Sequence, residues 1–484
     1  MKIVHHPAFL TSLLLAAFFF KGVFLAALFP VFTGQDEARH YNTLQYLNQP
    51  KIPAEQTTRR PIIQDKKDFS DYNFSEEIVN TGKAAGIDDL RRGLFDTQRF
   101  APDSFDGSNE STITRQTWKP YNFVEPADIV GSRSLYHTIA GTLESALSRH
   151  DILVRFYAIR IFSVFLGTIA VFLAFLIARA LRFDTFVSTL FAAIVALQPK
   201  FSMYTTNINY DALLIPTFFL FTWGGVMSLR KGIDWKNFSV MFIAVAVGLL
   251  TKGTAIVLLA AFLGIVFFHA YRFMQTRRHV KALFVKSMFA LFLVAGALAL
   301  SGGRYRYATL IPIDSSFSKT ITSLGKYLDK SLTFGRFGLS SRTYWGALGW
   351  NDDFLANHLT DTLWSIEGIA VAGLAIFLFS RKTPDFLPEK GAVAFLIAMI
   401  VALQLGIRVA DWNVFAHTGS LDLGTPGRYF LPNLASHLVL VFVGLGMLLG
   451  TRERLKIVLL CGVVLMCFFS TLVTFDLILP RFYL

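Results

Sequence analysis

The segment Gly34–His40 combines two carboxylates, a guanidinium and an imidazole within seven residues. It directly follows the apolar stretch Phe9–Phe32, so these groups lie where a membrane-spanning helix would meet water. Anchoring a helix at that depth needs only an aromatic or a lysine side chain. A cluster of two acids, an arginine and a histidine therefore indicates chemistry carried out at a membrane surface.

Asp36 and His40 are four residues apart, which places them on one face of a helix that begins near Gly34. A carboxylate on that face could accept a proton from a hydroxyl nucleophile. It could also hold a divalent cation together with a second acid from elsewhere. The structural alternative is that Asp36 and Glu37 occupy a first helical turn, where the dipole favours anions. We favour function, because capping does not account for Arg39 and His40.

A second polar cluster, residues 198–211, interrupts two apolar runs. It contains the side chains Gln198, Asn207, Asn209 and Asp211. An acid at the head of a span is costly to bury, so its presence suggests a use. Asp211 could instead serve as a simple N-cap. The orientation argument below places Asp211 on the same side of the membrane as Asp36, which favours a shared site.

Two basic residues occupy breaks between apolar runs. Lys252 lies in Thr-Lys-Gly-Thr, and Arg428 follows Pro-Gly at the start of another run. Each could bind a phosphate or only anchor its helix at the headgroups. Trp345 and Trp350 lie in a further loop. They could form a sugar-stacking platform or belong to an aromatic belt at the interface.

The composition fixes the class of protein that must position these residues. Of 484 residues, 53% are hydrophobic and only 16% are charged, against roughly a quarter in soluble proteins. The mean hydropathy is +0.49. We therefore expect an all-α polytopic membrane protein. The net charge of +13 does not indicate nucleic-acid binding, because the basic residues collect in short loops. Cys461 and Cys467 do not share a helical face, so neither a disulfide nor a metal site is expected.

A bilayer-spanning helix needs about 20 apolar residues. That rule predicts about eleven spans. They are 9–32, 152–181, 185–204, 211–229, 237–252, 254–273, 285–303, 361–380, 390–410, 428–450 and 455–475. The first run is too long for the core of a signal peptide, so we interpret it as a retained helix.

Basic residues fall on one side of these spans if the N-terminus is cytoplasmic. The opposite side then receives two large segments, 33–150 and 304–360. We expect the first to hold short amphipathic helices and ordered loop, so the whole chain, 1–484, forms a single transmembrane domain. The absence of an evident internal repeat counts against an inverted-repeat transporter.

Taken in order, the motifs resemble a bacterial branch of the GT-C superfamily of membrane glycosyltransferases. The branch has Pro-Asp-Glu-x-x-His, Pro-x-x-x-Met, Asn-x-Asp-Ala, Thr-Lys-x-Thr, Phe/Tyr-Trp-Gly and Gly-Arg-Tyr-x-x-Pro. The matching residues are Asp36-Glu37/His40, Pro199/Met203, Asn209/Asp211-Ala212, Thr251-Lys252/Thr254, Tyr344-Trp345-Gly346 and Gly427-Arg428-Tyr429/Pro432. Gln35 replaces the first proline. The resemblance covers about residues 9–435, and its specificity comes from the ordered set.

The resemblance implies a GT-C fold and an inverting sugar transfer from a polyprenyl-phosphate donor. Asp36 matches the catalytic base, with Glu37 beside it and Asp211 as a second acid that orients the acceptor or binds a cation. The implied phosphate ligands are Lys252, Arg428 and Lys200. The implied acceptor or sugar contacts are His40, Arg39, Asn209, Trp345, Trp350 and Tyr429. Members of the superfamily differ in their need for a divalent metal, so the cofactor stays open.

The resemblance also suggests a polysaccharide acceptor, such as O-antigen, and a site on the periplasmic face of a bacterial inner membrane. Three other functions remain open: a transporter or flippase of a lipid-linked substrate, a polysaccharide polymerase, and a metal-dependent hydrolase. The hydrolase is disfavoured because Asp-Glu-x-x-His lacks the first histidine of the zinc motif.

Overall fold

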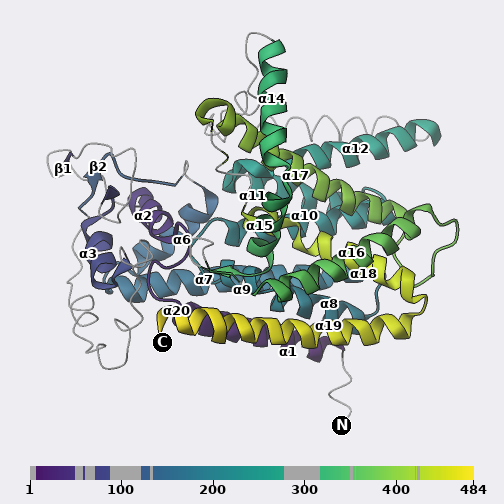
Figure 1. The fold of residues 1–484 in the computed structure, drawn as a ribbon, viewed down its shortest axis with the longest axis horizontal. Coiled ribbons are helices and arrows are strands. Elements are labelled where there is room, and N and C mark those ends of the chain that lie inside the picture. Colours follow the sequence, from purple (N-terminus) through teal and green to yellow (C-terminus); the bar gives the residue numbers. More distant parts are fainter. Residues whose placement is uncertain are drawn as a thin grey trace.

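The computed structural model describes residues 7–48, 58–59, 71–87, 122–130, 134–276, 317–348, 353–354, 356–419, 421 and 426–483. Long helices run side by side along the longest axis of the molecule, and short elements gather at one end of them (Figure 1). The chain is thus an all-α polytopic membrane protein, as its composition predicts. In the described residues, strands occur only as two short pairs. One is β1–β2, and the other is antiparallel, β3 (Ala347–Leu348) with β4 (Asp353–Phe354).

Eight described helices or helical runs are long and apolar enough to cross a membrane. Five of them lie in single helices: Phe9–Leu28 in α1 (Pro7–Leu28), Ile152–Ala180 (α7), Asp211–Lys231 (α10), Asn357–Phe379 (α16) and Lys390–Thr418 (α17). Two others each join two consecutive elements: Gly253–Arg272 joins η5 (Gly253–Ala255) and α12 (Ile256–Thr276), and Gly427–Leu449 joins η7 (Gly427–Asn433) and α18 (Leu434–Leu449). The last, Arg452–Phe482, joins α19 (Arg452–Leu472), η8 (Val473–Ile478) and α20 (Leu479–Phe482). Each of the eight coincides with an expected span. The expected span 285–303 lies outside the described residues.

Two expected spans correspond to shorter apolar helices. One is α11 (Trp235–Thr251). The other, 185–204, is divided into α8 (Thr185–Leu197) and α9 (Pro199–Tyr204). The division has a local cause, because Pro199 cannot donate a backbone hydrogen bond and disfavours a helical residue before it. Gln198 is extended there, and its side chain caps α9 by accepting from the amide of Phe201.

The described part of segment 33–150 forms three short helices, α2 (Glu37–Asn48), α3 (Glu76–Ala84) and α6 (Leu135–Ala146). Strand β1 (Thr58–Arg59) pairs in parallel with β2 (Val124–Glu125). Helix α2 packs against α6, and most of its side chains are buried. These elements lie together at one end of the long helices (Figure 1). They form a cap whose polar side chains can face the ends of the spans.

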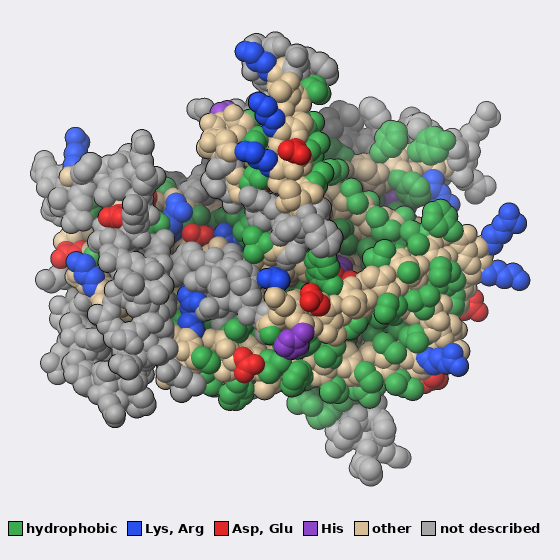
Figure 2. Space-filling model, viewed as in Figure 1, with side chains coloured by type: hydrophobic (Ala, Val, Ile, Leu, Met, Phe, Trp, Pro, Cys, Tyr) green, Lys and Arg blue, Asp and Glu red, His purple; other side chains and the backbone are tan. Residues whose placement is uncertain are grey.

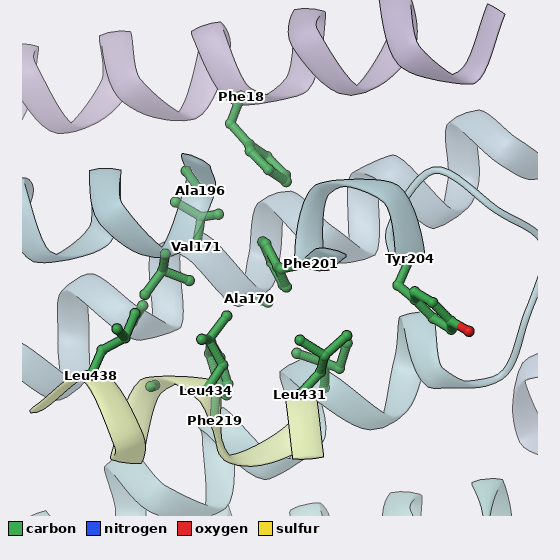
Figure 3. Packing of buried hydrophobic residues seen from close by; sticks show 14 of the residues in the cluster. Phe18, Ala170, Val171, Ala196, Phe201, Tyr204, Phe219, Leu431, Leu434 and Leu438 are labelled. Atoms are coloured by element: carbon green, nitrogen blue, oxygen red, sulfur yellow. The ribbon is translucent and has the colours of Figure 1, made fainter. Parts of the chain in front are cut away.

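Apolar side chains from α1, α7, α8, α9, α10 and the η7–α18 segment form one core (Figure 3). Phe18 of α1 stacks on Phe201 of α9, with ring centroids 5.7 Å apart. Tyr204 belongs to the same core, and its hydroxyl points out of it (Figure 3). Packing of this density leaves little freedom for the short helix α9. The core therefore fixes the position of the polar residues that follow it.

A buried ion pair ties the cap to the spans. Both Arg160 of α7 and Glu37 at the start of α2 are fully buried, and their closest atoms, Nη2 and Oε2, are 2.7 Å apart. The Arg160 guanidinium also donates to the carbonyls of Ala26 and Pro30, at 2.8 and 2.9 Å, just where α1 ends. A cation satisfies the free carbonyls at a helix C-terminus. This one pair thus joins α1, α2 and α7.

His40 and His137 connect α2 to α6. Their rings stack, and Nδ1 of His40 lies 2.9 Å from Nε2 of His137. Burial, reinforced by the neighbouring His137, lowers the pKa of His40 well below 6.5. Burial alone lowers the pKa of His137 to about 3. Both imidazoles are therefore neutral in the folded protein at neutral pH.

We predict that Glu37→Gln destabilises the protein, because it leaves the buried Arg160 guanidinium without its counter-charge. Breaking such a pair costs about 3–5 kcal/mol. We expect a fall in melting temperature on the order of 3–5 °C in detergent or nanodiscs. The double variant Glu37→Met with Arg160→Met should recover part of that loss. An unchanged melting temperature in Glu37→Gln would show that the pair does not join the cap to the spans.

We predict a loss of stability as the pH falls from 6.5 toward 3. In that range the unfolded chain binds protons at His40 and His137 while the folded chain does not, so acid favours unfolding. One imidazole of this kind costs about 2 kcal/mol of stability by pH 5. His137→Phe should flatten the dependence of the melting temperature on pH. The exposed His417, changed to Gln, is the matched control, and equal slopes in both variants would contradict the prediction.

Candidate functional site

Two carboxylate–cation pairs meet beside the cap. A carboxylate oxygen of Asp36 lies 3.3 Å from Nη2 of Arg428, and one of Asp211 lies 2.8 Å from Nζ of Lys252. These four residues come from the start of α2, η7, α10 and the break before α12. The sequence motifs that contain them are separated by up to 392 positions. The structure brings together the four charges that the sequence analysis assigned to one site.

Tyr429 links the two pairs. The Nζ atom of Lys252 lies 4.9 Å from the centre of the Tyr429 ring, and the guanidinium carbon of Arg428 lies 5.0 Å from it. The Tyr429 hydroxyl also accepts a hydrogen bond of 3.2 Å from Arg428. Cations at this distance from an aromatic ring are attracted by its electron-rich face. One ring thus holds two cations in a single site, where their mutual repulsion would otherwise separate them.

The backbone at Asp36 determines the direction of its side chain. Asp36 has a φ of +58°, in the left-handed region, which aspartate tolerates better than most residues. The structural alternative, in which Asp36 occupies the first helical turn, is therefore not what is observed, because α2 begins at the next residue, Glu37. In consequence Asp36 pairs with Arg428, while its neighbour Glu37 is buried against Arg160. The amides of Gly34 and Ile208 also donate to Glu37.

Helix breaks position the other pair. Lys252 is extended, with φ −154° and ψ 140°, between the end of α11 and η5. Asp211 is the first residue of α10, where the helix dipole stabilises an anion. It does not act as the N-cap. That position is Tyr210, and the side chain of Asn209 accepts from the amide of Ala212 at 3.1 Å.

Close packing of Gly427 positions Arg428. A Cβ atom at Gly427 would lie 2.3 Å from the amide nitrogen of Tyr344, so only glycine fits there. The amide of Gly427 donates to the Thr343 hydroxyl at 2.7 Å. Helix α15 (Phe334–Trp345) therefore lies directly against the start of η7. This contact places the Tyr-Trp-Gly and Gly-Arg-Tyr motifs side by side.

Two side chains of the 198–211 cluster bind the backbone at the end of α15 and just after it. The Gln198 amide donates to the carbonyl of Tyr344 at 2.6 Å, and Nζ of Lys200 donates to the carbonyl of Ala347 at 2.6 Å. Lys200 is only 1% exposed. The Lys200 ammonium therefore contacts the backbone just after α15, and it belongs to neither of the two carboxylate–cation pairs.

The remaining expected site residues lie around this centre. The His40 ring packs edge-on against Tyr210, with centroids 4.7 Å apart. The Arg39 guanidinium lies 6.0 Å from the Tyr72 ring. The Asn209 amide is buried and donates to the carbonyls of Tyr204 and Asn207. Trp350 lies outside the described residues.

Trp345 borders a cavity of about 430 Å³ next to the centre. The cavity is lined by Ser340, Ser341, Tyr344, Trp345, Trp364, Glu367, Ile400, Leu403, Gln404, Arg408, Phe430, Asn433 and His437. None of the four charged residues of the site lines this cavity. It nevertheless adjoins the site, because Phe430 and Asn433 belong to η7 with Arg428.

Sequence reasoning missed three residues of this arrangement. Arg160 stands in an apolar span, and a charge in such a place was a visible signal. Tyr204 accepts a 2.9 Å hydrogen bond from Arg428 and donates one of 2.7 Å to Gln35. Nothing in the sequence marked Tyr204. Gln35, which stands where the resembled motif has a proline, thus supports Arg428 through Tyr204.

The four charged side chains differ in exposure in a way that bears on their chemistry. Asp36 is 34% exposed, whereas Arg428, Lys252 and Asp211 are 12%, 14% and 8% exposed. An accessible carboxylate beside two cations can accept a proton while the cations bind an anion. Among the residues that the structure describes, no three His, Cys, Asp or Glu side chains group as metal ligands.

Part of the chain is similar to a known protein family. Residues 152–299 match the family model described as dolichyl-phosphate-mannose-protein mannosyltransferase. The matched part includes Asp211 and Lys252 and does not include Asp36 or Arg428. No curated protein matches the chain. The match supports a glycosyltransferase of the GT-C type that takes a lipid-linked sugar donor in a membrane setting.

Proposed function

We propose that the protein is an inverting glycosyltransferase that moves a single sugar from a polyprenyl-phosphate donor to a periplasmic acceptor. One observation carries the proposal: two carboxylate–cation pairs share the Tyr429 ring, and Asp36 is the most exposed of the four charges. The cations can bind the phosphate of the donor, and the exposed acid can accept the proton of the acceptor hydroxyl.

The depth of the site suits a lipid-linked donor. Arg428 and Asp211 each lie in the first turns of a candidate span, and Lys252 immediately precedes another. The phosphate of a membrane lipid lies at this level, because its chain must stay in the hydrocarbon. A soluble nucleotide-sugar donor would not need a phosphate-binding site at the depth where helices enter the bilayer.

The proposed reaction assigns a task to each charge. Asp36 accepts the proton of the acceptor hydroxyl as its oxygen forms a bond to the anomeric carbon. On the opposite face, the bond from that carbon to the phosphate oxygen breaks and its electron pair leaves with the polyprenyl phosphate. Arg428 and Lys252 stabilise the negative charge that grows on the phosphate. Attack opposite the leaving group inverts the anomeric configuration.

The ion pairs also suggest an order of events. In the structure, the Arg428 guanidinium donates hydrogen bonds to a carboxylate oxygen of Asp36. A phosphate that binds Arg428 would compete with that carboxylate and leave it open to the acceptor. Tyr204 and Tyr429 hold Arg428 in place, so the guanidinium can change partners without moving far. We therefore infer that the donor binds before the acceptor.

The other expected site residues take supporting tasks in this proposal. Asp211 holds Lys252. For a reaction that uses a divalent cation, Asp211 and Asp36 would be the protein ligands of that cation. Glu37 fixes the turn that carries Asp36. Lys200 fixes the loop that ends α15. His40, Arg39 and Asn209 support the cap side of the site, and Trp345 and Tyr429 offer aromatic surface to a sugar.

Setting and acceptor complete the proposal. We infer a bacterial inner membrane with the site on its periplasmic face and a surface polysaccharide, such as O-antigen, as acceptor. A transporter or flippase would spread charges along a path through the spans. The grouping of Asp36, Arg428, Asp211 and Lys252 favours a one-sided site. A polymerase would use a lipid-linked oligosaccharide, so a panel of polyprenyl-phosphate monosaccharides distinguishes it.

We predict that Asp36→Asn lowers the transfer rate by about 10²–10⁴-fold, because the amide cannot accept the proton of the hydroxyl. Transfer from a panel of polyprenyl-phosphate monosaccharides to native polysaccharide measures the rate. The variant should still fold, and donor binding should not weaken, because the amide competes less strongly than the carboxylate with the phosphate for Arg428. The exposed acid Asp385, changed to Asn, is the matched control. Wild-type turnover by Asp36→Asn would remove the proposed base.

We predict that Arg428→Ala weakens donor binding more than acceptor binding. Loss of charge-assisted hydrogen bonds to the phosphate costs about 1.5–3 kcal/mol, which raises the donor KM roughly 10–100-fold. Inhibition by polyprenyl phosphate without a sugar should weaken in parallel. The exposed Lys382, changed to Ala, controls for loss of a positive charge. An unchanged donor KM would show that Arg428 does not bind the phosphate.

A further inference from the structure

Helix α14 (Phe317–Ser331) presents three different faces. One face contacts α17. The Tyr327 hydroxyl donates to the buried Asp411 at 3.0 Å, and the Trp412 indole donates to the Ser323 hydroxyl at 3.2 Å. Tyr327 also packs with Trp412 and Phe415 in a small hydrophobic cluster. Side-chain contacts of this kind fix the rotation of α14 about its own axis.

A second face is apolar and exposed. The side chains of Ile321, Leu328 and Leu332 are 50%, 41% and 54% exposed. They are spaced seven and four residues apart, so they form one stripe that continues just past the end of the helix. An apolar stripe of this kind on a water-facing helix would be unfavourable. Something apolar must therefore cover it in the working protein.

The third face carries the exposed lysines Lys319, Lys326 and Lys330. At about 100° per residue, this basic stripe lies on the opposite side of α14 from the apolar stripe. In Figure 2, basic side chains follow one edge of the helix and hydrophobic side chains the other. Lys319 and Lys326 also line a hollow of about 430 Å³ that reaches Gly419 at the end of α17.

The position of α14 along the spans is set by its contacts. It touches Asp411, Trp412 and Phe415, which lie in the last two turns of the 29-residue helix α17. The hydrocarbon core needs only about 20 residues of helix, so these turns lie at its boundary. This end of α17 leads to η7 and Arg428. Helix α14 also runs crosswise to the long helices (Figure 1).

We propose that α14 is an interfacial helix that lies in the headgroup layer of the leaflet on the side of the candidate site. Its apolar stripe enters the acyl chains, and its lysines face the lipid phosphates and water. Opposed apolar and basic stripes on a helix parallel to the membrane plane are what such a surface binds. This inference does not depend on the proposed enzymatic function.

The proposal gives α14 a positional task. Helix α15 begins at Phe334, two residues after Leu332, and its last turn packs against Gly427, the neighbour of Arg428. A helix held at the headgroups therefore fixes the depth of α15, against which Gly427 packs. The lipid surface becomes one of the supports of the site.

The test places one nitroxide label at a time on α14, in full-length protein without its exposed cysteines (Cys461→Ser and Cys467→Ser). The labelled positions are Ile321→Cys, Leu328→Cys, Lys319→Cys and Lys326→Cys, in nanodiscs with anionic lipid. Oxygen, which concentrates in the bilayer, should relax labels at 321 and 328. A water-soluble nickel chelate should relax labels at 319 and 326. Val371→Cys on α16 and Arg149→Cys on the cap serve as exposed lipid and water references.

Two results would overturn the proposal. If the nickel chelate relaxes 321 and 328 as strongly as 149, the apolar stripe lies in water. If neither reagent reaches 321 and 328, and the labels show spin–spin broadening, a second copy of the chain covers the stripe. Neither relaxation measurement requires sugar-transfer activity, so the test is independent of the glycosyltransferase proposal. A label at Leu332→Cys provides a third apolar position if one variant fails to fold.

Discussion

The buried pair of Arg160 and Glu37 is the contact on which the rest of the site depends. Two fully buried charges are tolerated only when each has a partner and further hydrogen bonds. Arg160 meets this condition by binding the carbonyls at the end of α1, and Glu37 by accepting from the amides of Gly34 and Ile208. The pair therefore fixes the turn between α1 and α2 and the polar loop before α10 at once. Asp36 and Asp211 project from those two segments.

The sequence predicted the class of fold and most spans, because long apolar runs allow little else in a bilayer. It also predicted that Asp36, Asp211, Lys252 and Arg428 share one site. It could not predict the partner of each charge. The motif placed Glu37 beside Asp36 at the site, yet a left-handed residue at Asp36 sends its side chain to Arg428 and leaves Glu37 to Arg160. Which cation each acid pairs with therefore depends on the φ angle of Asp36, and neither composition nor motif spacing predicts that angle.

Other differences have the same origin in tertiary contacts. Lys200 has the charge expected of a phosphate ligand, but it is buried against the carbonyl of Ala347, at the loop that ends α15. Tyr204 had no motif, and its role follows from a core that aims its hydroxyl at Arg428. The helix break at Pro199, by contrast, had a local cause and was open to prediction. Sequence patterns thus predicted helices and their breaks better than the hydrogen-bond partners of individual side chains.

The paired charges of the site follow from its depth. At the boundary of a bilayer an unpaired charge is costly, so the protein alone must balance its own cations. Asp36 and Asp211 do this for Arg428 and Lys252. An incoming phosphate can replace a carboxylate on a cation with little change in net charge, while the released carboxylate regains its capacity to accept a proton. In the proposed reaction, the pairing of Asp36 with Arg428 would therefore also prevent Asp36 from accepting a proton before the donor is bound.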